Sequence, residues 1–313
     1  MQLPVIQPGQ KSATAGTEPP VFPRIGIVGL GLIGGSIALA ARQIWPTSLV
    51  IAVDNKDVLE TAMRLHAIDV AADDPIVLAE ADLVILAAPV RQNLAILEEL
   101  DENVHQAAVI TDTGSTKRAI VEAATRLPAR FTFVGGHPLS GGSVSGLEHA
   151  RPDLFADRQW IFTPRGDSAG EALDRLFAFT SALGAHPRVM TAGAHDRLMA
   201  FVSHLPQLTA SALMQIVGEA AGVEGLPLAG RGLVDTTRLA SSHPVIWKDI
   251  AATNADELGS ALDGLIALLQ GLRSDLDSGA RLTDVFEAAR EWRAALMRDR
   301  QPGPATVPTD PSV

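Results

Sequence analysis

His137 is the residue whose type and surroundings first suggest chemistry. It lies in the segment 133–146, FVGGHPLSGGSVSG, with glycines on both sides. A neutral imidazole takes up a proton near pH 7, so a histidine beside a ligand can act as a general base. Because glycine-rich runs interrupt strands and helices, we expect His137 on a loop that follows a buried strand over 131–134. A single loop histidine more often has no catalytic role, so the interpretation depends on its surroundings.

A glycine pattern, GLGLIGG, begins at Gly29 and could hold a dinucleotide. The apolar run 24–28 precedes it and the helical stretch SIALAARQI follows it, which is the context that gives G-x-G-x-x-G its meaning. The three glycines that match G-x-G-x-x-G, of which Gly34 is the last, would allow a tight turn, the approach of a pyrophosphate, and close packing of helix on strand. The anion would bind at the helix N-terminus. A purely structural turn is the alternative. The residues expected to bind the cofactor are Gly29, Gly31, Leu32, Ile33 and Gly34.

Asp54 supports the dinucleotide interpretation. It ends the apolar run 49–53 and follows the last glycine of the pattern by 20 residues. An acid at this place bonds the adenine ribose hydroxyls in NAD-binding proteins, and its charge repels the 2′-phosphate of NADP. We therefore expect NAD as the cofactor, although Lys56 nearby would favour a phosphate. The alternative for Asp54 is a turn or N-cap residue.

Strands and helices alternate through the first 190 residues. Apolar strands are also expected over 82–87, 108–111, 131–134, 159–163 and 187–190, with helices between them. This alternation predicts an α/β fold with a Rossmann-like, doubly wound, mostly parallel sheet.

Five candidate residues each follow the carboxyl end of a predicted strand, where ligands bind in open α/β sheets. They are Gly29, Asp54, Pro89, Ser115 and His137. This convergence strengthens the interpretation of His137 as an active-site residue and adds Pro89 and Ser115 to the cofactor site. The alternative for Ser115 is the N-cap of the following helix, a role that is compatible with facing a cofactor.

From about residue 191 the apolar residues recur at intervals of three and four, which predicts an all-α second part. The first helix is long, with Pro206 placed to kink it. Two further helices are expected over 256–275 and 284–297. Their apolar faces and the small size of this part suggest a dimer.

Two polar residues of the helical part could bind a substrate. Asp235 is a predicted N-cap that places Arg238 in the first turn of a helix, where its guanidinium could hold a carboxylate. An exposed arginine, or one paired with Asp235, is the alternative. For His204, which lies on an apolar face, the pattern alone favours a hydrogen-bonded core histidine.

Composition sets the broad class. The 313 residues, 47% of them hydrophobic, suffice for two domains, which we place at 22–190 and 191–299 between disordered tails at 1–21 and 300–313. The net charge of −11 gives no support to nucleic-acid partners, and no apolar run is long enough for a signal peptide or a membrane span. There are no cysteines, and the histidines lack metal-ligand spacing, so we expect no metal. A cytoplasmic location is the default expectation.

The motifs together resemble the prephenate/arogenate (cyclohexadienyl) dehydrogenase family of tyrosine biosynthesis. The resemblance runs from about Arg24 to Asn254 and is carried by GLGLIGGS, DTGSTK, GGHPLSGGSVSG, LFADRQWIFTP, HDRLMAFVSHLP and DTTRLASSHPVIWKDI, in the family's order. It implies an NAD-binding Rossmann domain followed by an all-α dimerisation domain that forms a homodimer. It also implies a reaction in which C4 of a cyclohexadienol gives a hydride to NAD and the loss of carbon dioxide makes the ring aromatic.

The resemblance further implies roles for single residues. His137 would accept the proton of the C4 hydroxyl, Ser115 would orient His137 and the nicotinamide, and Arg238 would bind a substrate carboxylate. The remaining residues of the implied substrate site are His204, Gln207, Ser143 and Asp235.

Two departures from the family's pattern leave the substrate open. Members acting on prephenate commonly read SHLPH, whereas this chain reads SHLPQ with Gln207, and many carry an acid at the place of Ser143. Prephenate, arogenate and a 4-amino analogue all stay possible. The alternatives for the whole protein are another two-domain NAD(P)-dependent dehydrogenase or imine reductase, and a non-catalytic NAD(H)-sensing protein, which would not need His137, Ser115 and Arg238 together.

Overall fold

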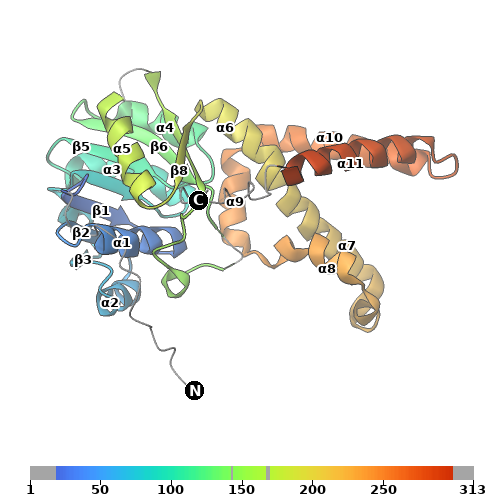
Figure 1. Ribbon diagram of the computed structural model, residues 1–313, viewed down its shortest axis with the longest axis horizontal. Helices are drawn as coiled ribbons and strands as arrows, with labels where there is room; N and C mark the ends of the chain where they lie inside the picture. The colour runs from blue at the N-terminus through green and yellow to red at the C-terminus, as the bar shows by residue number, and fades with distance from the viewer. Residues whose placement is uncertain (1–18, 142–143, 167–169, 299–313) are drawn as a thin grey trace, which may run out of the picture. The chain divides into compact units, whose positions relative to one another are not determined.

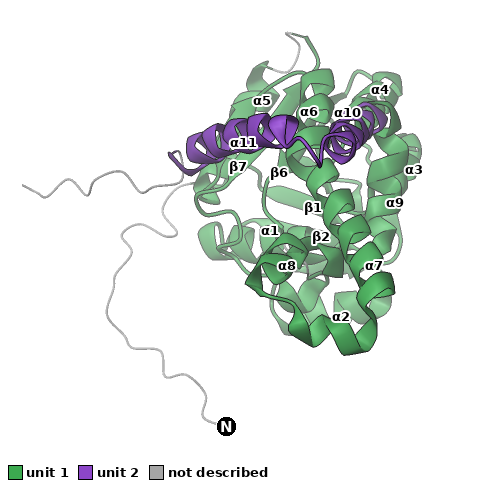
Figure 2. Cartoon of the chain, turned by 90° about the vertical axis from the view of Figure 1, so that its right-hand side faces the viewer, with its two compact units in different colours: residues 1–258 green, residues 259–313 purple. Residues whose placement is uncertain are grey.

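The computed structural model describes residues 19–141, 144–166 and 170–298, which pack as two compact units (Figure 2). The first unit, up to Leu258, contains the sheet and most helices, and the second contains the rest of the chain from Gly259. The predicted domain boundary at 190/191 stays a prediction. By packing, residues 192–258 belong with the sheet, because side chains of this segment bond directly to residues that follow the central strands.

Eight strands form one sheet in the described residues, in the order β3-β2-β1-β4-β5-β6-β7-β8. Figure 1 shows the sheet with helices packed around it. All neighbouring pairs are parallel except β6 and β7. The predicted mostly parallel, doubly wound sheet is confirmed. The strands are β1 (Arg24–Val28), β2 (Leu49–Val53), β3 (Val70–Ala72), β4 (Leu83–Leu86), β5 (Ala108–Asp112), β6 (Phe131–Pro138), β7 (Gln159–Pro164) and β8 (His186–Val189).

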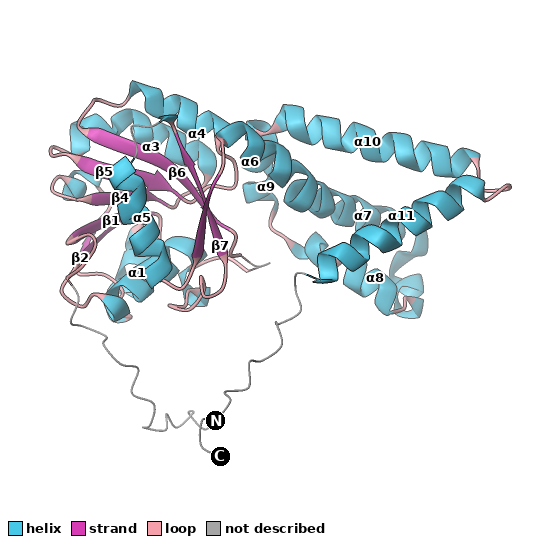
Figure 3. Cartoon of the chain, turned by 45° about the horizontal axis from the view of Figure 1, so that its top comes forward, coloured by secondary structure: helices cyan, strands magenta, loops and turns pink. Residues whose placement is uncertain are grey.

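Helices cover both faces of the sheet (Figure 3). One apolar core joins the sheet to α1 and α5, where Trp45 at the end of α1 stacks on Phe179 of α5 with ring centroids 5.3 Å apart. The other core, on the opposite face, contains Leu97 and Leu100 of α3 and Ile120 of α4. The helices of this part are α1 (Leu32–Ile44), α2 (Lys56–Arg64), α3 (Val90–Asn103), α4 (Arg118–Ala123) and α5 (Gly170–Ala182).

The later part of the described chain is helical, as predicted. Its first predicted helix is interrupted by a π-helical turn, Ala200–His204, which ends two residues before Pro206. Proline has no N–H to continue the α-helical ladder, so the preceding turn widens. The helices are α6 (Ala192–Met199), α7 (Leu205–Gly225), α8 (Arg231–Thr236), α9 (Pro244–Thr253), α10 (Ala255–Ser274) and α11 (Ala280–Arg298).

Candidate active site

The carboxyl ends of β2, β1, β4 and β5 lie side by side and bring the predicted cofactor residues to one edge. Parallel pairing of these strands places Asp54, Gly29, Pro89 and Ser115 in that order along the edge. Backbone bonds continue past the strand ends, from Gly29 N to Val53 O at 2.9 Å, for example. The sequence pattern thus located the edge that the fold builds.

The glycine loop has a shape that a dinucleotide requires. Gly29 has φ of +94°, which disfavours side chains, and a Cβ at Gly34 would lie 1.9 Å from Gly29 O. A Cβ at Gly31, by contrast, would meet nothing within 4 Å, so the backbone there borders open space. No described side chain caps the N-terminus of α1, whose first N–H groups begin at Leu32. These N–H groups are thus available to an anion.

Asp54 holds the glycine loop in place. Its Oδ2 accepts the N–H of Leu30 at 2.6 Å, and its Oδ1 accepts the N–H of Asn55 at 2.7 Å. Asn55, not Asp54, is the N-cap of α2. The carboxylate therefore lies directly beside the loop that would carry the pyrophosphate, where ribose hydroxyls bind in NAD proteins.

His137 lies inside β6, and the prediction of a loop at this position is wrong. The residue pairs with Ile161 of the antiparallel neighbour β7, after the parallel pairing of β6 with β5 has ended at Val134. Gly135 and Gly136 are needed there because a Cβ at either would lie within 2.5 Å of Thr163 Oγ1 or Asp112 O. The strand therefore carries the partly buried His137 past the end of β5, toward the edge that holds the cofactor residues.

A buried ion pair holds β6 immediately before His137. Lys117 and Asp112 are fully buried and bonded to each other. The Lys117 ammonium also donates to Gly136 O at 2.7 Å, and Asp112 Oδ1 accepts the Gly136 N–H at 3.1 Å. Burial lowers the pKa of Lys117, and its attraction to Asp112 opposes that shift. Both backbone groups of Gly136 are thus fixed by charged partners, which is a strong restraint.

Ser115 is not the N-cap of the following helix. Helix α4 begins at Arg118, and its first N–H groups are capped by a carboxylate from another helix. Asp196 of α6 accepts the N–H of Lys117 at 2.7 Å and the N–H of Arg118 at 2.9 Å. Because this capping residue lies 78 residues further along the chain, the sequence around α4 does not indicate it. Ser115 is partly exposed at the carboxyl edge of the sheet.

His137 is bonded to His195, which in turn is bonded to Asp196, and the sequence did not reveal a role for either residue. Its Nδ1 lies 2.8 Å from Nε2 of His195, and Nδ1 of His195 lies 2.8 Å from Oδ1 of Asp196. Burial and the neighbouring His195, Lys117 and His204 hold the pKa of His137 well below its usual value. The imidazole is therefore neutral at pH 7 and able to accept a proton.

His204 is a buried histidine whose bonding capacity is only partly used. It ends the π-helical turn, and its ring lies edge-on to Trp247 with centroids 6.1 Å apart. Nδ1 lies 3.4 Å from the amide nitrogen of Asn254, whereas the buried Nε2 has no partner in the described residues. Burial lowers the pKa of His204 to about 4. An unpaired buried nitrogen is costly unless a ligand or water bonds it.

Gln207 is buried, and protein groups occupy its amide. Nε2 donates to Leu239 O at 2.7 Å and lies 3.3 Å from Ser211 Oγ, while Oε1 accepts from Ser242 at 3.1 Å. These bonds join α7 to the 3-10 turn that begins at Arg238. The assignment of Gln207 to substrate binding thus stays a prediction, and its contacts indicate a connecting role.

Asp235 and Arg238 differ in part from expectation. Asp235 lies inside α8, whose N-cap is Gly230, so the N-cap prediction is wrong; the bonds of the following 3-10 turn begin at Thr237 instead. Both residues are exposed. Among the described residues, the guanidinium of Arg238 has no ion pair. Ser143 lies outside the described residues.

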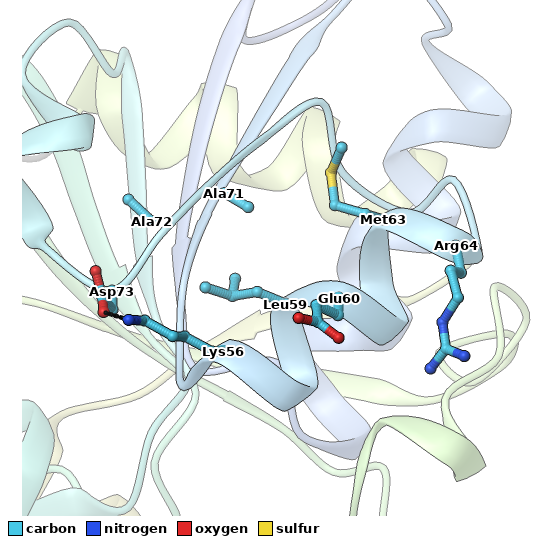
Figure 4. A pocket seen from close by; sticks show the side chains of 8 residues that line it. All are labelled: Lys56, Leu59, Glu60, Met63, Arg64, Ala71, Ala72 and Asp73. Atoms are coloured by element: carbon cyan, nitrogen blue, oxygen red, sulfur yellow. Dashed lines mark ion pairs between the residues drawn. The ribbon is translucent and has the colours of Figure 1, made fainter.

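A separate hollow lies between α2 and β3 (Figure 4). Lys56 and Asp73, whose charged groups are 3.6 Å apart, lie at one side of it. None of the predicted site residues contributes to its lining. In the ranges 19–141, 144–166 and 170–298 there is no cluster of three metal-ligand side chains, nor a helix long and apolar enough to cross a membrane.

Comparison with known proteins relates the chain to a family with two characteristic domains. Residues 37–189 match the nucleotide-binding domain of prephenate dehydrogenases, and residues 191–287 match their dimerization domain. The prephenate dehydrogenase of Bacillus subtilis is 35% identical over 302 residues, which cover 92% of this chain and 81% of that protein. The cyclohexadienyl dehydrogenase of Zymomonas mobilis is 32% identical over 289 residues, which cover 89% of this chain and 98% of that protein.

Solved structures give the same relationship. The prephenate dehydrogenase from A. aeolicus, solved with hydroxyphenyl propionate and NAD+, has a TM-score of 0.80 and 27% identity, covering 91% of this chain and all of its own. The Synechocystis arogenate dehydrogenase has a TM-score of 0.73 and 29% identity, covering 88% of this chain and 99% of its own.

Proposed function

The chain belongs to the prephenate dehydrogenase family, and we propose that it catalyses the NAD-dependent oxidative decarboxylation of prephenate, arogenate or both. The products would be 4-hydroxyphenylpyruvate and tyrosine respectively. The family membership expected from the sequence motifs is confirmed by the relatives. The observation that carries the proposal is the placement of His137: its ring is bonded to His195, the preceding Gly136 is held by Lys117, and its strand leads toward the edge where the glycine loop and Asp54 lie.

The residues present fit NAD. The open space at Gly31 and the uncapped N-terminus of α1 suit the pyrophosphate, and Asp54 suits the ribose hydroxyls rather than a 2′-phosphate. Pro89 and Ser115 would lie along the nicotinamide half. When bound, NAD would accept the hydride from C4 of the substrate.

His137 would act as the general base. Its Nδ1 is engaged by His195, so its Nε2 is the nitrogen left to take the proton of the C4 hydroxyl as the hydride leaves. The C4 oxygen then becomes a carbonyl. The bond to the ring carboxylate breaks, carbon dioxide departs, and its electron pair makes the ring aromatic. The proton on His137 returns to the oxygen to give the phenol, so the histidine ends neutral.

The substrate's acidic groups need donors, and Arg238 and His204 are the proposed ones. Arg238 is exposed on the turn that Gln207 holds, and His204 has an unpaired nitrogen. Roles for Asp235 and Ser143 stay predictions, as do the homodimer and the cytoplasmic location. The match of residues 191–287 to a dimerization domain supports the homodimer.

The decisive assay measures NADH or NADPH formation with prephenate and with arogenate, each with NAD and with NADP. We expect turnover with at least one substrate and a preference for NAD, because Asp54 repels a 2′-phosphate. Absence of turnover with both substrates would favour another dehydrogenase, an imine reductase or an NAD(H)-sensing protein.

Replacement of the base tests the assignment of His137. His137→Asn should lower kcat by roughly 10²–10⁴-fold, the usual contribution of general-base catalysis. NAD affinity, measured by fluorescence titration, should change little because the dinucleotide lies on other loops. His186→Asn, at an exposed edge-strand position, is the matched control. Unchanged turnover in His137→Asn would overturn the assignment.

A further inference from the structure

We propose that one polar group, made of the buried Asp196 and Asn254 and the partly exposed Arg118, sets opposite tautomers on the two site histidines. His137 thereby presents a lone pair at Nε2, and His204 presents an N–H at Nε2. The inference deepens the proposed function and rests on it for the identity of the substrate, but the tautomers themselves can be measured without any substrate.

Asp196 is the fixed charge from which the arrangement follows. Its side chain is fully buried and accepts four bonds: the N–H groups of Lys117 and Arg118, Arg118 Nε at 3.3 Å, and His195 Nδ1. Burial raises the pKa of this carboxyl, but the bonds from His195, Arg118 and Lys117 outweigh burial and lower it. A carboxylate in this state only accepts hydrogen bonds.

The direction of each bond from Asp196 to His137 is then determined. His195 Nδ1 must carry the hydrogen that it donates to Asp196. In the neutral ring its Nε2 is consequently an acceptor, and His137 Nδ1 must donate across the 2.8 Å contact. Burial keeps His195 neutral, and Lys117 adds to this while Asp196 and Asp112 oppose it. The hydrogen of His137 is therefore on Nδ1, which leaves the lone pair on Nε2.

Asn254 sets His204 the other way. Its Oδ1 accepts from Arg118 Nη2 at 2.9 Å, and its Nδ2 donates to Asp196 O at 2.8 Å, so the amide orientation is fixed from both ends. The same Nδ2 faces His204 Nδ1 at 3.4 Å and can only donate to it. His204 Nδ1 is then an acceptor, and the hydrogen is on the unpaired Nε2.

The result is a pair of neutral groups with complementary chemistry. His137 can accept the proton of a substrate hydroxyl, and His204 can donate to a substrate oxygen, either a carboxylate or a carbonyl. A hydroxy acid supplies both partners. Arg118, which is also bonded to Asp256 at the start of α10, ties Asp196 and Asn254 together without touching either histidine. Asp196, Asn254 and Arg118 are thus positioning residues rather than catalytic ones.

The tautomers can be read directly from long-range ¹⁵N–¹H NMR spectra of the full chain containing ¹⁵N-labelled histidine, without ligand at neutral pH. His137→Asn and His204→Asn spectra assign the two rings. We expect protonation at Nδ1 in His137 and at Nε2 in His204. His137 protonated at Nε2, or His204 at Nδ1, would overturn the inference whatever the enzyme's turnover.

Asp196→Asn tests the origin of the arrangement. An amide can turn its NH₂ toward His195 Nδ1, which reverses the bonds and moves the His137 hydrogen to Nε2, as an isosteric amide does in serine protease triads. We expect that shift in the spectrum and a loss of kcat on the order of 10²-fold or more. Asp153→Asn, an exposed position paired with Arg151, is the matched control for lost charge.

The outcomes separate the two proposals. An unchanged His137 spectrum in a folded Asp196→Asn variant would overturn this inference alone. Expected tautomers in a wild-type protein that turns over neither prephenate nor arogenate would overturn the proposed function alone.

Discussion

The imidazole of His137 lies among groups that disfavour its protonation. Burial, His195, Lys117 and His204 all lower its pKa. The carboxylates near this group, Asp196 and Asp112, are occupied by other donors. A general base works best when it is unprotonated at the working pH and still basic enough to take the proton. The lowered pKa makes His137 a weaker base but keeps it unprotonated, and so able to accept a proton, at the working pH.

This environment predicts the pH dependence of the enzyme. Because the pKa of His137 is lowered, the base stays neutral as the pH falls through 6.5, the ordinary value for histidine. We expect the acid limb of the kcat profile to have its midpoint below pH 6.5. Single-turnover rates with the preferred substrate measure the chemical step apart from product release. A midpoint at or above pH 6.5 would contradict the proposed environment of His137.

Residues with local signals could be predicted, and residues with distant partners could not. The glycine loop and Asp54 have fixed spacings because they serve one turn and the next strand. His195 and Asp196 matter only because α6 packs beside α4 and β6, and their bonds to His137 and Lys117 span 58 and 79 residues. The N-cap prediction for Asp235 is wrong because the residue lies within α8, and the alternative of an N-cap at Ser115 is excluded because the distant Asp196 caps α4.

At the scale of elements, the hydrogen bonds of Gln207 connect α7 to the turn that begins at Arg238. They predict that Gln207 affects the substrate indirectly, through this turn. Gln207→Leu removes the bonds to Leu239 O and Ser242 and leaves a partly buried carbonyl without its donor, at a cost of about 1–3 kcal/mol. The turn that carries Arg238 should loosen. We expect KM to rise roughly tenfold for prephenate and arogenate alike, with a smaller change in kcat.

The control for this tie is Gln215→Leu, an exposed position on the same helix that bonds only to Glu219 in the described residues. Steady-state kinetics with both substrates distinguish the two roles of Gln207. A direct contact with the substrate's side chain would change the preference between prephenate and arogenate. Such a change, with unaltered KM for one of them, would contradict the connecting role.

The end of β6 is an element boundary that the sequence did not predict. The run GGHP predicts the end of a strand by composition. The strand continues because β7, which is antiparallel to it, offers pairing partners as far as Pro138. Strand β7 begins at Gln159, well beyond the residues that surround His137 in the sequence. A short sequence segment around His137 therefore does not show that the strand continues. Strands with parallel neighbours and apolar runs, such as β1 and β2, were predicted with their observed bounds.

At the scale of the molecule, exposed apolar side chains support the proposed homodimer. In the first unit, Val223 and Leu228 are 87% and 88% exposed; in the second, Phe286 and Trp292 of α11 are 62% and 77% exposed. Exposed apolar side chains of this size are the kind that a dimer interface would cover. We expect light scattering to give twice the chain mass of 32.9 kDa. Phe286→Glu should weaken the dimer, whereas Met63→Glu on α2 should not.

A monomer mass for the wild-type protein at micromolar concentration would contradict the dimer. An equal effect of the two substitutions would instead show that the surface containing Phe286 is not part of the interface.

The stability of the fold should depend on pH through the same histidines that serve the reaction. His204 has a pKa of about 4 in the folded chain and near 6.5 when unfolded. Between these values the unfolded state binds the proton and the folded state does not. The contribution of His204 to the free energy of unfolding is therefore fully present above pH 6.5 and is lost as the pH falls toward 4. The loss from His204 is about 3 kcal/mol.

Urea titrations at fixed protein concentration should show this loss reduced in His204→Gln and unchanged in His105→Gln, whose side chain is exposed. Equal acid sensitivity of wild type and His204→Gln would mean that the buried ring is not held neutral by the fold. The proposal of opposite tautomers requires both His137 and His204 to be neutral, and it would then fail for His204.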